Sequence, residues 1–274
     1  MLIRIVVSVV LLPLLVLVLY IAPNWALPVA IAALSALSTL EMLMFSGLVK
    51  NKRLAVYAAA FAASIPFWCW TGAPILYGAA GLFALVLLLF AEAVTDHERV
   101  TFAQVSASLF AATVIPLFLS SLIRLAALST GRYLVLFPFL AAFGSDIFAL
   151  FAGKYLGRHK LAPAVSPKKT VEGSIGGLLG ALLLTTLYCL ALRMFFDISM
   201  PWAPLLITAL IGAAVSQLGD LSFSLIKREN GVKDFGRILP GHGGILDRFD
   251  SLLFAAPVVE LCLMILLPLF GWTP

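Results

Sequence analysis

Charge is scarce in this sequence: only 11% of its 274 residues are Asp, Glu, Lys or Arg, and the mean hydropathy is +1.10. This composition lies outside the range of soluble proteins, and we expect no nucleic-acid partner. Apolar runs long enough to cross a bilayer recur along the chain, whereas alternating barrel strands are absent. We therefore predict an all-α polytopic integral membrane protein, with the lipid bilayer as its surroundings.

Cysteine and histidine are also rare, and this limits the kinds of metal or redox centre. The sequence holds only Cys69, Cys189, Cys262, His97, His159 and His242. Each cysteine lies in an apolar run, so we predict buried side chains instead of a disulfide framework. No histidine has a cysteine beside it, and nothing suggests a zinc site.

The hydropathy pattern predicts nine spans, each near the ~20 residues that cross a bilayer. They cover 3–22, 25–49, 54–71, 74–92, 102–128, 132–152, 173–196, 203–226 and 251–270. No small-residue cleavage site follows the first run, so we expect it to be retained as a span. About five spans fill an N-terminal region, 1–140. The region 141–274 holds two chemically rich loops, 153–172 and 227–250.

The distribution of positive charge predicts the orientation. Alternate connections, counted from the N-terminus, carry all of the 18 Lys and Arg except Arg124, Arg132 and Arg193. The positive-inside rule places the charged connections in the cytoplasm. With nine spans, the N-terminus is then cytoplasmic and the C-terminus outside, and both rich loops lie on the cytoplasmic face.

Four carboxylates are embedded in apolar sequence, where a charge at the bilayer centre costs about 2.5–3.5 kcal/mol. They are Glu41, Asp146, Asp220 and Glu260. For Glu41 and Glu260 we favour a packing role inside the helix bundle. Asp146 and Asp220 each lead into a charged loop, and helical spacing places Asp220, Ser224 and Lys227 along one stripe.

Two further aspartates, Asp247 and Asp250, are three residues apart at the mouth of the last span and would share a helix face. We expect them and Asp220 to converge at the cytoplasmic ends of two helices. Such carboxylates suit a hard cation such as Mg²⁺, held with waters and substrate phosphate oxygens, and a second cation is left open. A charge-paired rim, for example Asp220 with Arg248, is the alternative.

The turn PGHGG, residues 240–244, precedes this last helix. Gly241, Gly243 and Gly244 permit positive φ and let backbone approach a ligand. A helix that starts here would present bare amides to phosphate. His242 could donate to phosphate or act as an acid or base near neutral pH.

The second rich loop, SPKKTVEGSIGG, spans residues 166–177. It offers Ser166, Lys168, Lys169, Thr170 and Glu172, followed by Gly173, Gly176 and Gly177, which allow close helix packing. It is not a Walker A loop, whose lysine follows a glycine run. A plain positive-inside signal is the alternative. Cations, glycine amides and carboxylates on one face are what metal-assisted phosphoryl or nucleotidyl transfer requires, here on a lipid.

Residues 222–250, SFSLIKRENGVKDFGRILPGHGGILDRFD, resemble the signature of the CDP-diacylglycerol synthase family (phosphatidate cytidylyltransferases). The matching elements are Ser224, Lys227, Arg228, Lys233, Asp234, Gly236, PGHGG at 240–244 and DRFD at 247–250. QLGD at 217–220, SPKKTVEG at 166–173, and Ser145 with Asp146 and Gly153 also look like the family. Leu150 and Val171 differ from its pattern, both at packing positions.

The resemblance implies that CTP and phosphatidate give CDP-diacylglycerol and pyrophosphate with a divalent metal, at the cytoplasmic face of a bacterial-type inner membrane. We expect Asp220 and Asp247 to hold Mg²⁺ on CTP, with Asp250 as a further ligand. The catalytic set is completed by Lys227, Arg228 and His242. The substrate-binding set comprises Asp146, Ser166, Lys168, Lys169, Thr170, Glu172, Ser224, Lys233, Asp234, Arg237, Gly241, Gly243, Gly244 and Arg248. A phosphate oxygen of phosphatidate attacks the α-phosphorus, so no protein nucleophile is required.

Two other functions are compatible with the sequence. A CTP-dependent polyprenol or phytol kinase would need a base for its alcohol, such as His242 or Asp146. An ion-coupled transporter would use the four embedded acids, but the polar residues gather at one face and no repeat is evident. A homodimer is compatible with the sequence, which does not determine the oligomeric state.

Overall fold

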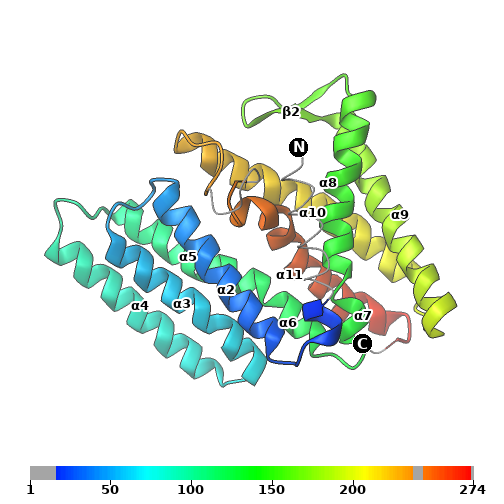
Figure 1. The fold of residues 1–274 in the computed structure, drawn as a ribbon, viewed down its shortest axis with the longest axis horizontal. Coiled ribbons are helices and arrows are strands. Elements are labelled where there is room, and N and C mark those ends of the chain that lie inside the picture. The colour runs from blue at the N-terminus through cyan, green and yellow to red at the C-terminus, as the bar shows by residue number, and fades with distance from the viewer. Residues whose placement is uncertain (1–16, 237–242, 273–274) are drawn as a thin grey trace. The chain divides into compact units, whose positions relative to one another are not determined.

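The computed structural model describes residues 17–236 and 243–272 (Figure 1). Within these ranges, eight helices are long and apolar enough to cross a membrane. They are Ala26–Phe45, Lys52–Thr71, Ile75–Thr95, Phe102–Ala126, Gly131–Tyr155, Val171–Phe196, Trp202–Glu229 and Leu246–Leu269. Each coincides with a predicted span, which confirms an all-α integral membrane protein.

The predicted first span, 3–22, lies mostly outside the described residues. Its described end contains the π-helical turn η1 (Leu17–Ile21). The total of nine spans, and the orientation derived from it, therefore stay predictions.

The chain forms two compact units that do not follow the sequence order. Unit 1 comprises the described residues up to Arg124 together with those of Lys227–Phe249, and unit 2 comprises those of Leu125–Ile226 and Asp250–Pro274. The polar segment near the C-terminus thus belongs with the N-terminal helices. The division at residue 140, which rests on where the sequence signatures lie, stays a prediction.

Unit 1 is built from helices that lie side by side in Figure 1. They are α2 (Ala26–Leu40) with the π-helical turn η2 (Glu41–Phe45), α3 (Lys52–Thr71), α4 (Ile75–Thr95) and α5 (Phe102–Leu119), followed by the start of α6 (Ser121–Ala126). Buried alanines on α3, among them Ala55, Ala58 and Ala62, let neighbouring helices approach closely, as is typical of membrane bundles. Thr39 on α2 donates a hydrogen bond to the carbonyl of Ala111 on α5.

Side chains that cap the helix starts explain where several helices begin. Asn51 accepts a hydrogen bond from the backbone of Arg53 at the start of α3, and Thr101 accepts one from Gln104 at the start of α5. These are the residue types preferred at this position, because they satisfy amides that have no partner within the helix. Gly72 ends α3 with a φ of +63°, a conformation that glycine adopts without strain.

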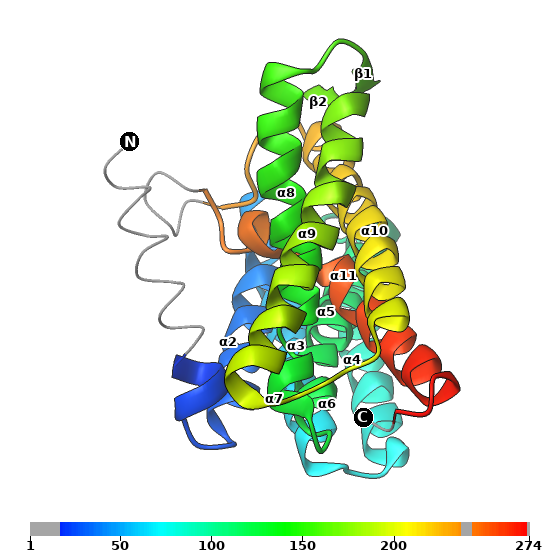
Figure 2. The ribbon, with the colours of Figure 1, turned by 90° about the vertical axis from the view of Figure 1, so that its right-hand side faces the viewer.

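Unit 2 contains the end of α6, α7 (Gly131–Leu134), α8 (Phe137–Tyr155), α9 (Val171–Phe196), and most of α10 (Trp202–Glu229) and α11 (Leu246–Leu269). The predicted loop 153–172 holds a short antiparallel hairpin of β1 (Lys160–Ala162) and β2 (Ser166–Thr170), which the sequence analysis did not predict. Figure 2 shows the hairpin joining the ends of α8 and α9, which run side by side.

A row of glycines on α9 brings it against α8, as predicted for the start of this span. A Cβ atom on Gly173 would lie 2.9 Å from the carbonyl oxygen of Ala149, and one on Gly176 or Gly180 would overlap Ala152 or Phe148. The close contact between these two helices therefore depends on the absence of side chains along this row.

Gly180→Ala is expected to destabilise the protein by about 1–3 kcal/mol, because the new methyl group overlaps Phe148 near its attachment to the backbone. Gly78→Ala on α4 is a matched control. Its Cβ would lie 3.5 Å from Trp68, an ordinary contact, and helical alanine is favoured over glycine. Thermal unfolding of both variants in detergent checks this, and equal melting temperatures would contradict the proposed packing.

Candidate active site

Each unit carries its own cluster of residues around predicted site aspartates. In unit 2, the helix cluster consists of Ser145, Asp146, Lys169, Ser174, Gln217, Asp220, Ser224, Asp250 and Ser251. In unit 1, the loop cluster consists of Glu41, Lys227, Phe235, Gly236 and 243–247. Because α10 and α11 each pass through both units, each of these two helices supplies residues to both clusters.

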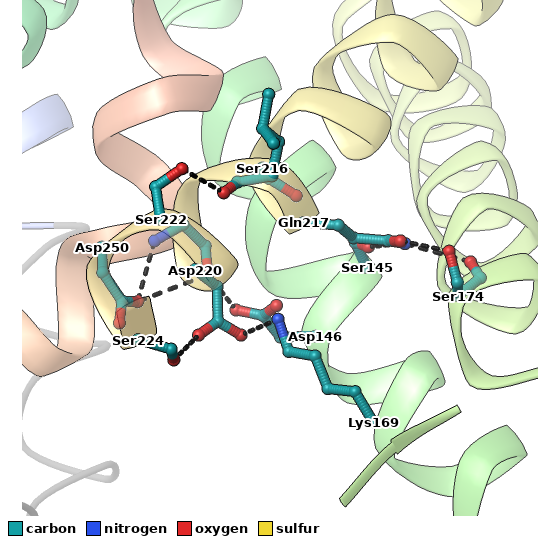
Figure 3. Close-up of polar contacts among 12 residues, drawn as sticks. Ser145, Asp146, Lys169, Ser174, Ser216, Gln217, Asp220, Ser222, Ser224 and Asp250 are labelled. Carbon is teal, nitrogen blue, oxygen red and sulfur yellow. Dashed lines mark hydrogen bonds and ion pairs between the residues drawn. The ribbon is translucent and has the colours of Figure 1, made fainter. Parts of the chain in front are cut away.

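Asp220 on α10 contacts two other side chains of the helix cluster (Figure 3). Its Oδ2 lies 2.6 Å from Lys169 Nζ, and the hydroxyl of Ser224 donates to its Oδ1 at 3.4 Å. The contact with Ser224 confirms the part of the predicted stripe that joins Asp220 to Ser224, whereas Lys227, the third member of that stripe, binds Asp247. The contact with Lys169 shows that the end of β2 and α10 meet, so the second rich loop reaches a predicted metal ligand.

Ser251 joins two other carboxylates of the helix cluster. Its hydroxyl donates to Asp146 Oδ2 at 2.9 Å, and its backbone N–H donates to Asp250 Oδ1 at 2.8 Å. Asp250 and Ser251 are buried on α11, whereas Asp146 lies on α8. The structure thus links Asp146 to the aspartate signature of the last helix, although the sequence assigned Ser251 no role.

Gln217 ties three helices together beside these carboxylates (Figure 3). Its Nε2 donates to Ser145 Oγ on α8 at 2.9 Å and to the carbonyl of Ser174 on α9 at 3.0 Å. The hydroxyl of Ser174 donates back to Gln217 Oε1. Ser145 immediately precedes Asp146, and Gln217 lies one turn before Asp220. Gln217 therefore links α8, α9 and α10 close to both aspartates, a set of contacts that the QLGD motif alone did not reveal.

The hairpin is held to α9 by two predicted substrate-binding residues. Thr170 accepts a hydrogen bond from the backbone of Gly173 and caps α9. The carboxylate of Glu172 accepts from the backbone of Arg158 at 3.0 Å and lies 2.6 Å from His159 Nδ1. Ser166 and Lys168 lie on β2, with Lys168 exposed. The structure thus gives Thr170 and Glu172 structural contacts, and their contact with substrate stays a prediction.

Asp247 is the centre of the loop cluster. Its Oδ1 accepts a hydrogen bond from Lys227 Nζ at 2.9 Å, and its Oδ2 accepts from the backbone of Phe235 at 2.9 Å and of Gly244 at 3.0 Å. Lys227 also lies 5.2 Å from the ring centroid of Phe235, a cation–π distance. Lys227 and Asp247 are both buried, so removing either one would leave an uncompensated buried charge and destabilise the protein.

The start of α11 differs from the prediction. The helix begins at Leu246, so Asp247 and Asp250 share it as expected. Its first amides are not bare, however: Gly244 donates to Asp247, and Ile245 and Leu246 donate to Glu41. The prediction that these amides are free for a phosphate is therefore wrong, because two carboxylates of the protein already occupy them.

The remaining predicted residues of the loop divide into exposed and undescribed ones. Arg228, Lys233, Asp234 and Arg248 are exposed. Gly243 has a φ of +86°, the positive value predicted for this turn. Arg237, Gly241 and His242 lie outside the described residues, so their predicted roles stay predictions.

The donors of both clusters fit a hard cation by their chemistry, since they are carboxylate and hydroxyl oxygens. Among the described residues, no three His, Cys, Asp or Glu side chains are gathered into a metal-binding group. Asp220 and Asp247 are instead each neutralised by a lysine. Charge pairing was the alternative explanation for these aspartates, and the structure shows it with Lys169 and Lys227 as the partners.

Comparison with known proteins shows similarity along nearly the whole chain. Residues 2–266 match the model of the cytidylyltransferase family. A phosphatidate cytidylyltransferase of Staphylococcus saprophyticus is 39% identical over 183 residues, which are 67% of this chain and 68% of that protein. One of Staphylococcus epidermidis is 38% identical over 184 residues, 67% of this chain and 68% of its own. One of Staphylococcus aureus is 48% identical over 136 residues, half of this chain and 51% of its own.

Proposed function

Because the chain belongs to the cytidylyltransferase family, we propose that it transfers the cytidylyl group of CTP to phosphatidate, forming CDP-diacylglycerol and pyrophosphate in phospholipid biosynthesis. The observation that carries the proposal is that two predicted site aspartates each pair with a lysine, Asp220 with Lys169 and Asp247 with Lys227. This arrangement occurs in a chain whose relatives are named phosphatidate cytidylyltransferase. These relatives do not favour the lipid-kinase alternative.

The transfer requires little covalent chemistry from the protein. A phosphate oxygen of phosphatidate forms a bond to the α-phosphorus of CTP, the bond to the β-phosphate oxygen breaks, and pyrophosphate leaves with the electron pair. The protein must therefore position two anions and offset their charge. Lys169 and Lys227 are cations already fixed by carboxylates, and the exposed Arg228, Lys233 and Arg248 add positive charge near the helix ends.

We propose that Asp220, Asp247 and Asp250 hold Mg²⁺, as the sequence predicts. When bound, Mg²⁺ would neutralise phosphate charge and orient the α-phosphorus. Hydrogen bonds within the protein already orient the three carboxylates. Their donors are Ser224, Ser251 and the backbone amides of residues 235 and 244.

The proposed location is a bacterial inner membrane with the active site on the cytoplasmic face. Support comes from the positive-inside distribution of Lys and Arg and from the eight membrane-length helices in the described part of the chain. CTP is a cytoplasmic nucleotide and phosphatidate a membrane lipid, so this face brings both substrates together. The homodimer that the sequence allows stays a prediction.

An acceptor comparison tests the proposed reaction. Purified protein in lipid nanodiscs receives CTP, Mg²⁺ and either phosphatidate or a polyprenol, and the lipid products are identified by mass spectrometry. We expect a CDP-lipid with phosphatidate and no phosphorylated polyprenol. Formation of phosphorylated polyprenol and free CDP, with no CDP-lipid from phosphatidate, would support the kinase and contradict the proposal.

A further inference from the structure

Glu41 is a fully buried carboxylate in the N-terminal half, where the sequence carries no functional signature. It lies where α2 passes into η2 and is the first residue of that π-helical turn. π-Helical turns are rare and frequently occur at functional sites. A carboxylate buried in a membrane protein also needs specific partners, so its contacts indicate its role.

Both carboxylate oxygens of Glu41 bind the start of α11, more than 200 positions away in the sequence. Oε1 accepts a hydrogen bond from the backbone of Ile245 at 3.0 Å, and Oε2 accepts one from Leu246 at 2.8 Å. The first amides of a helix have no partner within it and carry the positive end of its dipole. Glu41 therefore caps α11 from a different helix, and both partners belong to unit 1.

Two glycines, Gly236 and Gly244, lie so close to the Glu41 carboxylate that a side chain would not fit at either position. A Cβ atom on Gly236 would overlap the side chain of Glu41, and its three nearest atoms would all belong to that side chain. A Cβ atom on Gly244 would lie 2.5 Å from Glu41 Oε2. Gly236 and Gly244 can both lie against Glu41 only because neither has a side chain, so two nearby positions of the C-terminal polar segment depend on one carboxylate of the N-terminal helices.

Three consecutive amides are thereby divided between two carboxylates. The amide of Gly244 goes to Asp247, and those of Ile245 and Leu246 go to Glu41. If Glu41 were absent, the two vacated amides would attract the carboxylate of Asp247, which already accepts from the neighbouring amide of Gly244. Asp247 would then turn away from Lys227.

We infer that Glu41 is a positioning residue for cytidylyl transfer: it occupies the amides of Ile245 and Leu246 and so keeps Asp247 oriented for Mg²⁺ and substrate. This rests on the proposed function, in which Asp247 holds Mg²⁺. Glu41 itself is fully buried, and we assign it no direct contact with substrate.

Glu41→Gln tests the inference, because glutamine keeps the shape but replaces one acceptor oxygen with an NH₂ group facing an amide. Thr39→Val is the matched control: it removes another buried hydrogen bond two residues away, from Thr39 to Ala111, without touching the loop. Turnover is measured against Mg²⁺ concentration, and unfolding temperature is measured for both variants. Loss of a group that is hydrogen-bonded to a metal ligand typically costs 10–100-fold in affinity or activity, and because Glu41 acts on Asp247 through the neighbouring amides we expect the lower end of this range.

For Glu41→Gln we expect a half-saturating Mg²⁺ concentration raised by about tenfold or more, with turnover partly restored at high Mg²⁺. Thr39→Val should lower the unfolding temperature without changing the Mg²⁺ requirement. A purely structural role for Glu41 would lower stability and the active fraction but leave the half-saturating concentration unchanged. That result would overturn the inference.

A double-mutant cycle probes the same contact from the other side. Gly236→Ala alone should impair turnover, because its methyl group displaces the Glu41 side chain. In a Glu41→Ala background the methyl group has room, so its added effect should be much smaller, the non-additivity expected of residues in contact. Additive effects would contradict the contact.

Hydrogen exchange supplies a readout that needs no substrate. Peptides that contain the amides of 245 and 246 should exchange faster in Glu41→Gln than in Thr39→Val, and equal exchange would overturn the capping role. If the unmodified protein makes no CDP-lipid, the proposed function fails. If it does, and Glu41→Gln keeps the normal Mg²⁺ requirement, only the inference fails.

Discussion

Asp247→Asn is expected to lower turnover by about 10²–10³-fold, the largest effect of any single substitution in the loop cluster. The carboxylate accepts from Lys227 and from two backbone amides, and asparagine cannot satisfy all three donors with one remaining oxygen. The change also removes the negative charge proposed to hold Mg²⁺. Turnover of CTP with phosphatidate, at fixed protein and saturating Mg²⁺, measures the loss.

Stability must be separated from chemistry in this test. Breaking a buried ion pair by removing one partner typically costs about 3–5 kcal/mol, and the side chains of Lys227 and Asp247 are only 9% and 2% exposed. The double variant Lys227→Met/Asp247→Asn removes both charges and should regain much of the stability while remaining inactive. Glu229→Gln, an exposed change on the last turn of α10, is the control that should keep full activity. Near-normal Mg²⁺-dependent turnover in folded Asp247→Asn would contradict the proposed role.

Asp220→Asn is expected to lower turnover by about 10²-fold or more with little loss of stability. Its ion pair with Lys169 is partly solvated, with side chains 27% and 25% exposed, and such pairs contribute about 0–1 kcal/mol. A large catalytic loss beside a small shift in unfolding temperature would mark a functional carboxylate. The same assay as above measures it, with unfolding followed in parallel.

The control for Asp220→Asn is another partly exposed pair. Glu92 lies 3.4 Å from Arg53, and Glu92→Gln breaks that pair in a part of unit 1 that holds no predicted site residue. It should cost as little stability as Asp220→Asn and leave turnover unchanged. If both substitutions reduce turnover equally, the loss reflects a general effect of ion pairs, and Asp220 has no special role.

Local features of the sequence predicted much of this molecule. Apolar runs located eight of the nine predicted spans, because length and hydropathy are properties of each segment alone. Helical spacing correctly placed Asp220 beside Ser224 and put Asp247 and Asp250 on one helix. The glycines of α9 were correctly expected to allow close packing, since a helix can approach another only where side chains are small.

Contacts between distant segments could not be predicted in this way. Glu41 was expected to have a packing role, yet it binds amides 204 and 205 positions later. Neither periodicity nor composition indicates which buried donors a carboxylate will meet. For the same reason the sequence did not show that the segment 227–249 belongs with the N-terminal helices, or that Gln217 joins α8, α9 and α10.

The fate of two phosphorus labels tests the central claim most directly. Purified protein is incubated with phosphatidate, Mg²⁺ and CTP labelled at either the α- or the γ-phosphorus, and the lipid is then extracted. Cytidylyl transfer predicts that the α-label enters the lipid as CDP-diacylglycerol while the γ-label remains in water as pyrophosphate. Entry of the γ-label into lipid, or absence of both labels from it, would contradict the account.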